Sequence, residues 1–165
     1  MPEKDFEALI KKSVIDKEMI RPARIIPTYE VKVRKNAKHA EIMLIVDDVE
    51  LNRVILAQIF KKDYTIVEAD NGAAALRYLR DNTKKIAIVM LDLIMPVMDG
   101  FEVLSKMKSS LEYKHIPVIV TSQTGEEMEI KALKMGADDF VAKPYIEQVC
   151  RKRVENVVAA LGKNI

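Results

Sequence analysis

Residues 86–100 read IAIVMLDLIMPVMDG, an apolar run that ends on the carboxylate of Asp92. Residues 86–91 are almost entirely Ile, Val, Met and Leu, which is typical of a strand covered on both faces. Burying an unpaired carboxylate costs several kcal/mol, or raises its pKa until the group is neutral. We therefore expect Asp92 either to face water at a strand end or to be held there by other groups for a purpose.

Short apolar runs and helical patterns alternate around this segment, from residue 42 onward. The runs that we expect to be strands are 42–46, 65–69, 86–91, 117–121 and 139–142. The helical patterns that follow them are 50–62, 71–81, 100–109, 126–135 and 145–161. Strands that alternate with helices form parallel sheets through right-handed crossovers. The sequence therefore predicts an α/β fold, with an open parallel sheet and helices on both faces.

Apolar spacing predicts which helix faces are buried. In the first helix the predicted buried stripe is Leu51, Val54, Ile55 and Ile59. In the last helix it is Ile146, Val149, Cys150, Val154, Val157 and Leu161. Asp99 precedes the third helix as a candidate N-cap, and Gly136 follows the fourth as a candidate C′ residue.

Chemically active side chains follow several of the predicted strands. Asp47 and Asp48 come after the first strand, and Asp92 after the third. Thr121 stands at the end of the fourth strand and Lys143 at the end of the fifth. Function in open parallel sheets collects at the carboxyl ends of the strands. We therefore expect three carboxylates, a hydroxyl and an ammonium to meet at one edge, where Asp92 lies.

This set of groups suits phosphoryl transfer to an aspartate. Carboxylates are hard oxygen ligands that suit Mg²⁺, and an aspartate can act as a nucleophile and form an acyl phosphate. Phosphoryl transfer needs in-line positioning and positive charge near the phosphoryl oxygens. A cation held by Asp48 and Asp92 would supply part of that charge, and Lys143 would supply more. The Thr121 hydroxyl can donate a hydrogen bond to a phosphoryl oxygen.

Four motifs, in this order, resemble the receiver domain of bacterial two-component response regulators. They are LIVDD at 44–48, LDLIMPVMDG at 91–100, VIVTS at 118–122 and DDFVAKPY at 138–145. The resemblance runs from about residue 42 to 161. It implies a flavodoxin-like, doubly wound, five-stranded parallel sheet in the order 2-1-3-4-5, with helices on both faces. It also implies a phosphorelay protein that is not an enzyme beyond its own phosphorylation and dephosphorylation. Independently of the resemblance, the lack of a secretory signal and of a bilayer-spanning run makes a cytoplasmic protein the default expectation.

The resemblance also assigns roles around the metal. Asp92 corresponds to the phosphoacceptor, Asp48 to a direct Mg²⁺ ligand and Asp47 to an acid that acts mostly through water. The backbone carbonyl of Ile94 would be a further ligand. Mg²⁺ is the expected cofactor, with Mn²⁺ as an alternative.

Three further positions match the family's switch. Thr121 corresponds to the switch hydroxyl, Lys143 to the invariant ammonium and Phe140 to the switch aromatic. Pro144 matches the family's cis-proline. Phosphorylation would draw Thr121 inward, and Phe140 would fill the vacated space.

Ile94 and Gln123 occupy positions where the family tunes the lifetime of the phosphorylated state. Neither side chain is a base that could activate water, so we expect slow hydrolysis of the acyl phosphate.

Several alternatives remain open at this level. Partial similarity to receivers fused to cyclic-dinucleotide enzymes leaves the alternative of a fragment of a longer regulator with an output domain. A phosphatase of the haloacid dehalogenase type is disfavoured, because it needs a second carboxylate where Ile94 stands. A flavodoxin-like electron carrier is disfavoured by the acidic DDVE at 47–50, which would repel a flavin phosphate.

The composition of the chain limits the cellular environments and the kinds of partner that we expect. The chain has 165 residues, is 49% hydrophobic and 32% charged, and carries a net charge of +2, too small to indicate nucleic-acid binding. Cys150 is its single cysteine, so no internal disulfide can form. No apolar run is long enough to span a bilayer, and the N-terminus is not that of a secretory signal. The expected partners are a sensor histidine kinase, a second copy in a homodimer, and an output domain or downstream protein.

Residues 1–41 lack the βα repetition and form a predicted extension, before a receiver domain at 42–161 and a tail at 162–165. The extension is expected to hold a helix at 3–20 and a short strand at 29–33, YEVKV. We expect this strand to pair with another strand, either of the same chain or, as the favoured alternative, of a second copy. The predicted apolar face of the helix is Phe6, Leu9, Ile10 and Val14.

Overall fold

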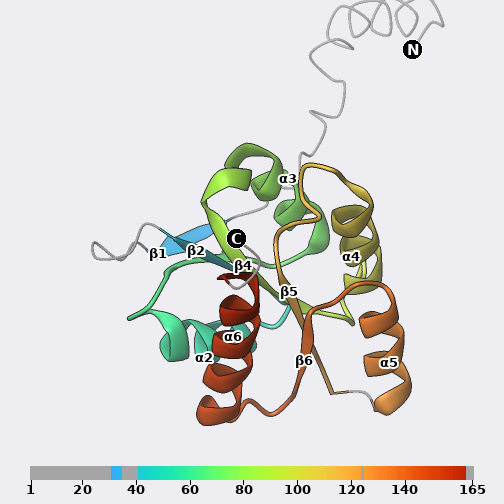
Figure 1. Ribbon diagram of the computed structural model, residues 1–165. Coiled ribbons are helices and arrows are strands. Elements are labelled where there is room, and N and C mark those ends of the chain that lie inside the picture. Colours follow the sequence, from blue (N-terminus) through green and yellow to red (C-terminus); the bar gives the residue numbers. More distant parts are fainter. Residues whose placement is uncertain (1–30, 35–40, 124, 163–165) are drawn as a thin grey trace, which may run out of the picture.

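A six-stranded sheet organises the protein, whose computed structural model describes residues 31–34, 41–123 and 125–162 (Figure 1). The strands are β1 (Lys32–Arg34), β2 (Ile42–Val46), β3 (Thr65–Ala69), β4 (Ile86–Asp92), β5 (Val118–Ser122) and β6 (Asp139–Ala142). Their order across the sheet is β1-β3-β2-β4-β5-β6. The five strands from β2 to β6 are parallel to one another, so the predicted order 2-1-3-4-5 is confirmed.

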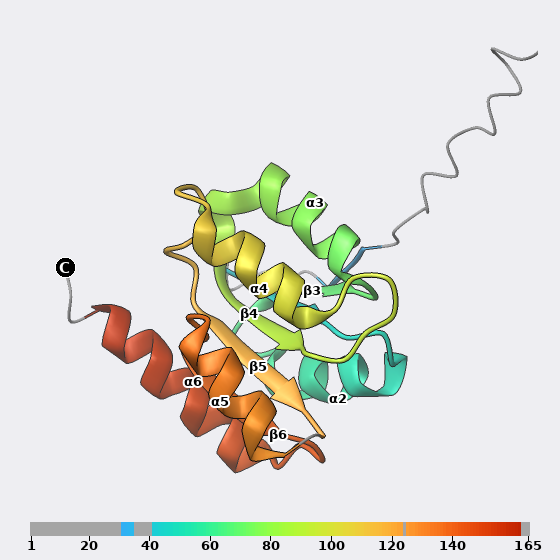
Figure 2. The same ribbon diagram turned by 90° about the vertical axis from the view of Figure 1, so that its right-hand side faces the viewer.

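Helices cover both faces of this sheet (Figure 2). The helices are α2 (Glu50–Phe60), α3 (Gly72–Asn82), α4 (Gly100–Ser109), α5 (Glu126–Lys134) and α6 (Glu147–Gly162), with a 3₁₀ turn, η1, at Thr83–Lys85. Buried residues of α2 and α6 pack on one face, and those of α3, α4 and α5 pack on the other. Among the described residues, no helix combines the length and the apolar character needed to cross a bilayer.

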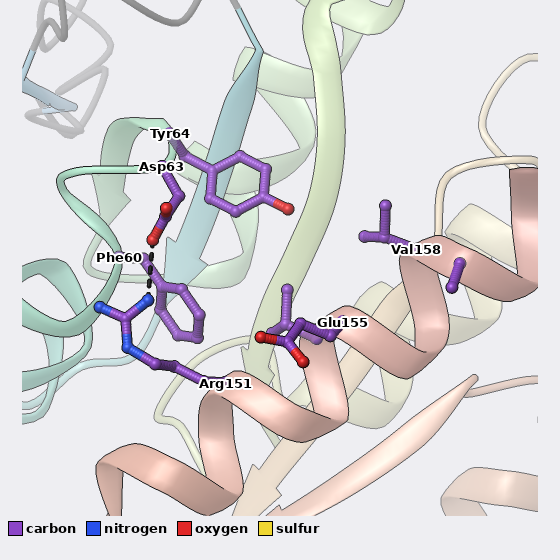
Figure 3. A pocket seen from close by; sticks show the side chains of 8 residues that line it. Phe60, Asp63, Tyr64, Arg151, Glu155 and Val158 are labelled. Carbon is purple, nitrogen blue, oxygen red and sulfur yellow. Dashed lines mark hydrogen bonds and ion pairs between the residues drawn. The ribbon is translucent and has the colours of Figure 1, made fainter.

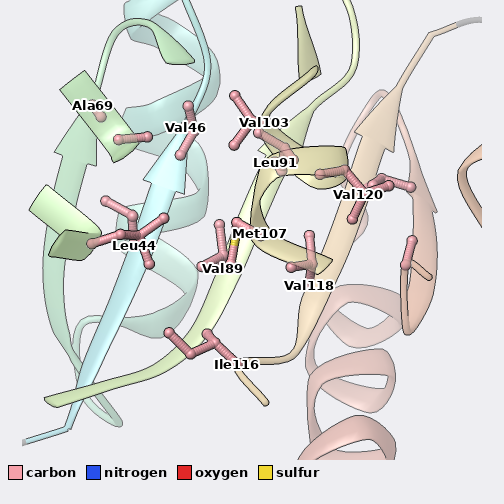
Figure 4. Close-up of a cluster of buried hydrophobic side chains, with 14 of the residues drawn as sticks. Leu44, Val46, Ala69, Val89, Leu91, Val103, Met107, Ile116, Val118 and Val120 are labelled. Atoms are coloured by element: carbon pink, nitrogen blue, oxygen red, sulfur yellow. The ribbon is translucent and has the colours of Figure 1, made fainter. Parts of the chain in front are cut away.

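Side chains along each central strand point alternately to the two faces of the sheet and contribute to two apolar cores. In β2, Leu44 and Val46 belong to the core under α3, α4 and α5, whereas Met43 and Ile45 belong to the core under α2 and α6. Figure 4 shows the first of these cores, where side chains of β2, β4 and β5 meet Val103 and Met107 of α4. Because both faces are covered, the central strands read as continuous apolar runs, as the sequence predicted.

Local signals at helix ends are confirmed. The Asp99 side chain caps α4 by accepting a hydrogen bond from the Glu102 amide, at 2.9 Å. Asn71 caps α3 in the same way through the Ala74 amide. Gly136 follows α5 with a φ of +103°, a conformation that a residue with a Cβ adopts at a cost. These caps fix where α3 and α4 leave the carboxyl edge of the sheet.

The predicted buried stripe of the first helix is largely wrong. Leu51 is 65% exposed and Ile55 is exposed as well, while Ile59 is buried. The residues that α2 buries are Arg53, Leu56, Ala57, Ile59 and Phe60. This face is rotated because Arg53 turns inward to the buried carboxylate of Glu68, an ion-pair contact that apolar spacing cannot reveal.

The predicted stripe of the last helix is right in the middle and wrong at its ends. Cys150, Val154 and Val157 are buried, as expected. Ile146, Val149 and Leu161 are exposed. Ile146 precedes the first residue of α6, and the helix covers the sheet along its central turns.

The predicted five-stranded sheet gains a sixth strand from the N-terminal extension. β1 pairs antiparallel with β3 of the same chain, with Lys32 opposite Glu68 and Arg34 opposite Ile66. Of the predicted strand at 29–33, residues 32 and 33 lie in β1 and residue 31 does not, while residues 29 and 30 lie outside the described residues. β1 pairs within its own chain, which is the alternative that the sequence did not favour. Val33, in the middle of β1, is exposed. The predicted helix at 3–20 lies outside the described residues.

Candidate functional site

Three carboxylates meet at the carboxyl edge of the sheet. Asp47 directly follows β2, Asp48 comes next in the chain, and Asp92 ends β4. One carboxylate oxygen from each lies within 4.8 Å of the others. Asp47 and Asp92 are buried, whereas Asp48 is exposed to solvent. The predicted acidic cluster is therefore assembled, with its open side at Asp48.

Lys143 lies between the two buried carboxylates. Its Nζ is 2.9 Å from Asp47 Oδ2 and 3.2 Å from Asp92 Oδ1. The lysine follows β6, and its amide donates to the Ser122 carbonyl at 3.0 Å, which fixes its backbone beside β5. The Lys143–Pro144 peptide bond is cis, as the resemblance implied. One ammonium thus faces two buried carboxylates.

These surroundings change the acidity of Asp92 and Lys143. Burial, and then the negative charge of Asp47, raises the pKa of Asp92 from 3.8 to about 6, although Lys143 opposes this increase. Burial alone would lower the pKa of Lys143. Hydrogen bonding and charge attraction from Asp47 and Asp92 outweigh it, so the pKa of Lys143 is raised. Near neutral pH the site therefore holds a cationic lysine and an Asp92 that ionises less readily than an ordinary aspartate.

The acidic loop after β2 is held by its own backbone. The Val49 amide donates to Asp47 Oδ1 at 2.8 Å, and the Asn52 side chain approaches the same oxygen at 3.4 Å. The Asp47 amide donates to the Ala69 carbonyl at 3.2 Å, which ties the loop to β3. These contacts set the direction of the Asp47 carboxylate before any ligand arrives.

Strand register brings Thr121 to the site. Thr121 of β5 stands opposite Asp92 of β4 and is 1% exposed. The Ile94 amide donates to Asp92 Oδ1 at 3.4 Å, so the loop after β4 curls back toward the carboxylate. The Ile94 side chain is 52% exposed. The carbonyl of Ile94 as a metal ligand remains a prediction.

The loop between β4 and α4 passes close to the backbone of Asp92. A Cβ on Gly100 would lie 2.1 Å from the Asp92 carbonyl oxygen and 2.7 Å from the Leu93 Cα. Only glycine allows this approach, and the Gly100 amide donates to the Leu93 carbonyl at 2.9 Å. Val97 in the same loop has a φ of +69°, which is rare for a β-branched residue. The loop therefore carries local strain next to the carboxylate.

The donor set fits a hard divalent cation. All three acidic residues offer carboxylate oxygens, the ligand type that Mg²⁺ prefers. Asp47 Oδ2 is buried and lies 2.9 Å from the Lys143 ammonium, with no other hydrogen-bonding group against it among the described residues. A cation near the exposed Asp48 would relieve the excess negative charge of the cluster.

Two charged residues that pattern reasoning missed support the acidic loop. Arg53, in the first turns of α2, donates from Nη1 to the Asp47 carbonyl at 2.7 Å. Its Nε lies 3.6 Å from Oε1 of Glu68 in β3, and both side chains are buried. The available signal was a lone Glu inside the apolar run TIVEA at 65–69, since a buried carboxylate requires a cationic partner.

A separate hollow of about 350 Å³ lies between α2 and α6 (Figure 3). Phe60 and Val158 form part of its apolar wall, and Arg151 joins its two sides. Arg151 Nη1 pairs with Asp63 at 2.8 Å, and its other terminal nitrogen donates to the Ile59 carbonyl. Because it is lined from the C-terminal end of α2, this hollow is remote from the acidic loop, which precedes that helix. Its contacts dock α6 onto α2.

Comparison of the chain with known proteins identifies a family with the same domain. The response regulator receiver domain matches residues 43–155. Histidine kinase P4 of Formosa agariphila is 35% identical over 122 residues, which are 73% of this chain and 9% of that kinase. The chain thus spans a small part of the kinase, and the kinase's activity as a whole protein is not assigned to it.

Two further matches extend over most of the related protein. Chemotaxis protein CheY of Halobacterium salinarum is 34% identical over 122 residues, which are 73% of this chain and 99% of CheY. A chain in the crystal structure of the CheX–CheY–BeF₃–Mg²⁺ complex from Borrelia burgdorferi is 32% identical. It superposes with a TM-score of 0.66, over 71% of this chain and 88% of that one. Phosphorylation-mediated switching is the general function of such domains, and the chain belongs to the family of response regulator receiver domains of two-component systems.

Proposed function

We propose that Asp92 accepts a phosphoryl group from a phosphohistidine of a sensor histidine kinase. The observation that carries this proposal is the position of Lys143, whose Nζ lies within 3.2 Å of carboxylate oxygens from both Asp47 and Asp92. A buried carboxylate that ends a core strand beside an ammonium is suited to attack phosphorus and to retain the product. Related proteins support the assignment, since they include a histidine kinase and CheY proteins.

The transfer is a substitution at phosphorus. An oxygen of Asp92 forms the new O–P bond while the P–N bond of the phosphohistidine breaks, and the imidazole nitrogen keeps the electron pair and takes up a proton. Lys143 and the Ile94 amide both contact Oδ1 of Asp92, so we assign Oδ2 to the attack. The Lys143 ammonium stabilises the charge on the phosphoryl oxygens, and the Thr121 hydroxyl donates a hydrogen bond to one of them.

Mg²⁺ is the proposed cofactor, with Mn²⁺ as an alternative. Asp48 and Asp92 would bind it directly, together with the Ile94 carbonyl, and Asp47 would act mostly through water. When bound, the ion supplies positive charge next to the phosphoryl oxygens. The related CheX–CheY complex of Borrelia burgdorferi contains Mg²⁺ and BeF₃, which supports a divalent cation in this fold.

The proposed switch connects Asp92 to the surface of β6. Phe140 of β6 is 9% exposed and belongs to the core under α5, so its ring is already in a buried position. We therefore expect phosphorylation to hold Thr121 inward and to increase the population of the state in which Phe140 is buried. NMR spectra recorded with beryllofluoride test this step. Shifts spread over residues 121–145 support it, and shifts confined to neighbours of Asp92 contradict it.

The proposed output surface lies on α5, β6 and α6. A hollow of about 410 Å³ there is lined by both Phe140 and Lys143, together with the exposed apolar side chains of Ile146 and Val149. Two site residues are therefore part of the wall that a partner would touch. A second copy of the chain, or an output domain or downstream protein, is the proposed occupant.

Intact-mass spectrometry tests the phosphoacceptor. With phosphoramidate and Mg²⁺ we expect a gain of about 80 Da, the mass of one phosphoryl group. The gain should disappear in Asp92→Asn and in the presence of EDTA. Asp99→Asn is the matched control, because this exposed residue caps α4 and asparagine caps equally well. A full gain of mass in Asp92→Asn would overturn the proposal.

A further inference from the structure

The short strand β1 is connected to the acidic loop through three consecutive side-chain contacts. Arg34 lies at the end of β1, at the edge of the sheet (Figure 1). Its partner Glu68 also contacts Arg53, and Arg53 contacts the backbone of Asp47. We propose that β1, acting through Arg34, Glu68 and Arg53, holds the acidic loop in the geometry that binds the metal. This inference rests on the function proposed above.

The first step is the need of Glu68 for a cation. Glu68 is 2% exposed, although it carries a carboxylate in a core strand. Arg34 Nε donates to its Oε2 at 2.8 Å. The other oxygen, Oε1, lies 3.6 Å from Arg53 Nε, and neither of these two atoms has a hydrogen-bond partner among the described residues. Arg34 therefore supplies the well-directed hydrogen bond that a buried carboxylate requires.

The second step is the division of Arg53 between two acceptors. Arg53 is buried, and its Nη1 donates to the Asp47 carbonyl at 2.7 Å. Without Arg34, Arg53 would be the one cation paired with Glu68 in the described part of the chain, and the attraction between them would draw the guanidinium toward Glu68. The bond to the Asp47 carbonyl would then lengthen.

The third step carries this displacement to the metal-binding groups. The Asp47 carboxylate is bonded to the Val49 amide at 2.8 Å and lies 2.9 Å from Lys143 Nζ. A shift of the Asp47 backbone changes both contacts and moves the adjacent Asp48, the exposed member of the cluster. Groups that orient metal ligands typically change metal affinity 10- to 100-fold when mutated. Arg34 acts through two intermediates, so its effect should be smaller.

Lys32 provides a matched control on the same strand. Its Nζ pairs with Glu50 Oε1 at 3.1 Å, and both side chains are more than half exposed. Exposed pairs contribute little to stability. The Lys32 pair ends at the first residue of α2 and does not reach the Asp47 carbonyl. A general effect of weakening β1 would therefore show in both Lys32 and Arg34 variants, whereas the proposed contacts involve Arg34 alone.

The experiment uses the full chain with Arg34→Ala, Arg34→Lys and Lys32→Ala. Isothermal titration calorimetry measures the Mg²⁺ dissociation constant of each protein, and circular dichroism confirms folding. We expect Arg34→Ala to weaken Mg²⁺ binding by about 3- to 10-fold, Arg34→Lys to restore part of it, and Lys32→Ala to stay within about 1.5-fold of the parent. In a Glu68→Gln background, the effect of Arg34→Ala should vanish.

A second measurement needs no metal. Amide NMR shifts of metal-free Arg34→Ala should change in residues 47–53, beyond the strand that was altered. If the parent binds no Mg²⁺, the proposed function is overturned, and this NMR comparison alone decides the positioning role. If the parent binds Mg²⁺, the inference requires both results. Unchanged Mg²⁺ affinity in Arg34→Ala, or shifts confined to β1 and β3, overturns it.

Discussion

Replacing Asp92 with asparagine should stabilise the metal-free protein above neutral pH. Asp92 is 4% exposed, and its pKa of about 6 lies above the ordinary value of 3.8 because burial and Asp47 disfavour its charge. Asparagine keeps the shape and removes that charge. Lys143 retains a partner, since Asp47 Oδ2 lies 2.9 Å from its Nζ.

The magnitude follows from the two pKa values. At 1.36 kcal/mol per pH unit, the difference between 3.8 and about 6 corresponds to about 3 kcal/mol. The attraction to Lys143 is already contained in the pKa of about 6. Solvent at the rim of the site reduces the difference to about 1–2 kcal/mol. For a chain of this size, we expect the melting temperature to rise by roughly 3–6 °C.

The pH dependence gives the prediction its sign. Between pH 3.8 and about 6, the folded parent holds the Asp92 proton more tightly than the unfolded chain does. Its free energy of unfolding therefore falls, relative to that of the variant, as the pH rises through this window. The difference between variant and parent should be largest above about pH 7, about half as large near pH 5, and close to zero below about pH 4.

Urea unfolding of both proteins in EDTA, at several pH values from 4 to 8, measures this difference. Titrating groups remote from Asp92 cancel between parent and variant. Asp99→Asn, which keeps an N-cap acceptor, should stay within a few tenths of a kcal/mol of the parent throughout. The reasoning is refuted if Asp92→Asn is less stable than the parent at pH 8, or if the difference is the same at pH 4 and pH 8.

Three further outcomes follow from the loop after β4 and from the site itself. Because neither Ile94 nor Gln123 is a base for water, the phosphorylated protein should hydrolyse with a half-life on the order of tens of minutes or longer, and mass spectrometry showing a half-life of seconds would contradict this. Gly100→Ala should destabilise the fold by about 3 kcal/mol in urea unfolding, since its Cβ would meet the Asp92 carbonyl oxygen at 2.1 Å, and a loss below about 1 kcal/mol would show that the loop relaxes freely. Val97→Gly should stabilise the protein by roughly 0.5–1 kcal/mol, because Val97 has a φ of +69° and is 98% exposed, so little packing is lost; a lower melting temperature would refute this reasoning.

The sequence alone determined the parallel sheet and the residues at its carboxyl edge. Its βα units are visible as local periodicity in the sequence. A strand that is covered on both faces appears as a continuous apolar run. Asp47, Asp92, Thr121 and Lys143 could be placed together because parallel strands all end at one edge. The caps at Asp99 and Gly136 were predictable because each depends on only a few neighbouring residues of the chain.

Tertiary structure decided what depends on partners distant in the sequence. No periodicity indicates that Arg53 turns inward, because that orientation is set by Glu68 on another strand, and the rotation exposes Leu51. The pairing of β1 with β3 is likewise non-local, since an edge strand chooses among all unpaired edges. The acidity of Asp92 depends on burial and on distances to Asp47 and Lys143, which exist only once three separate strands have been brought to one edge.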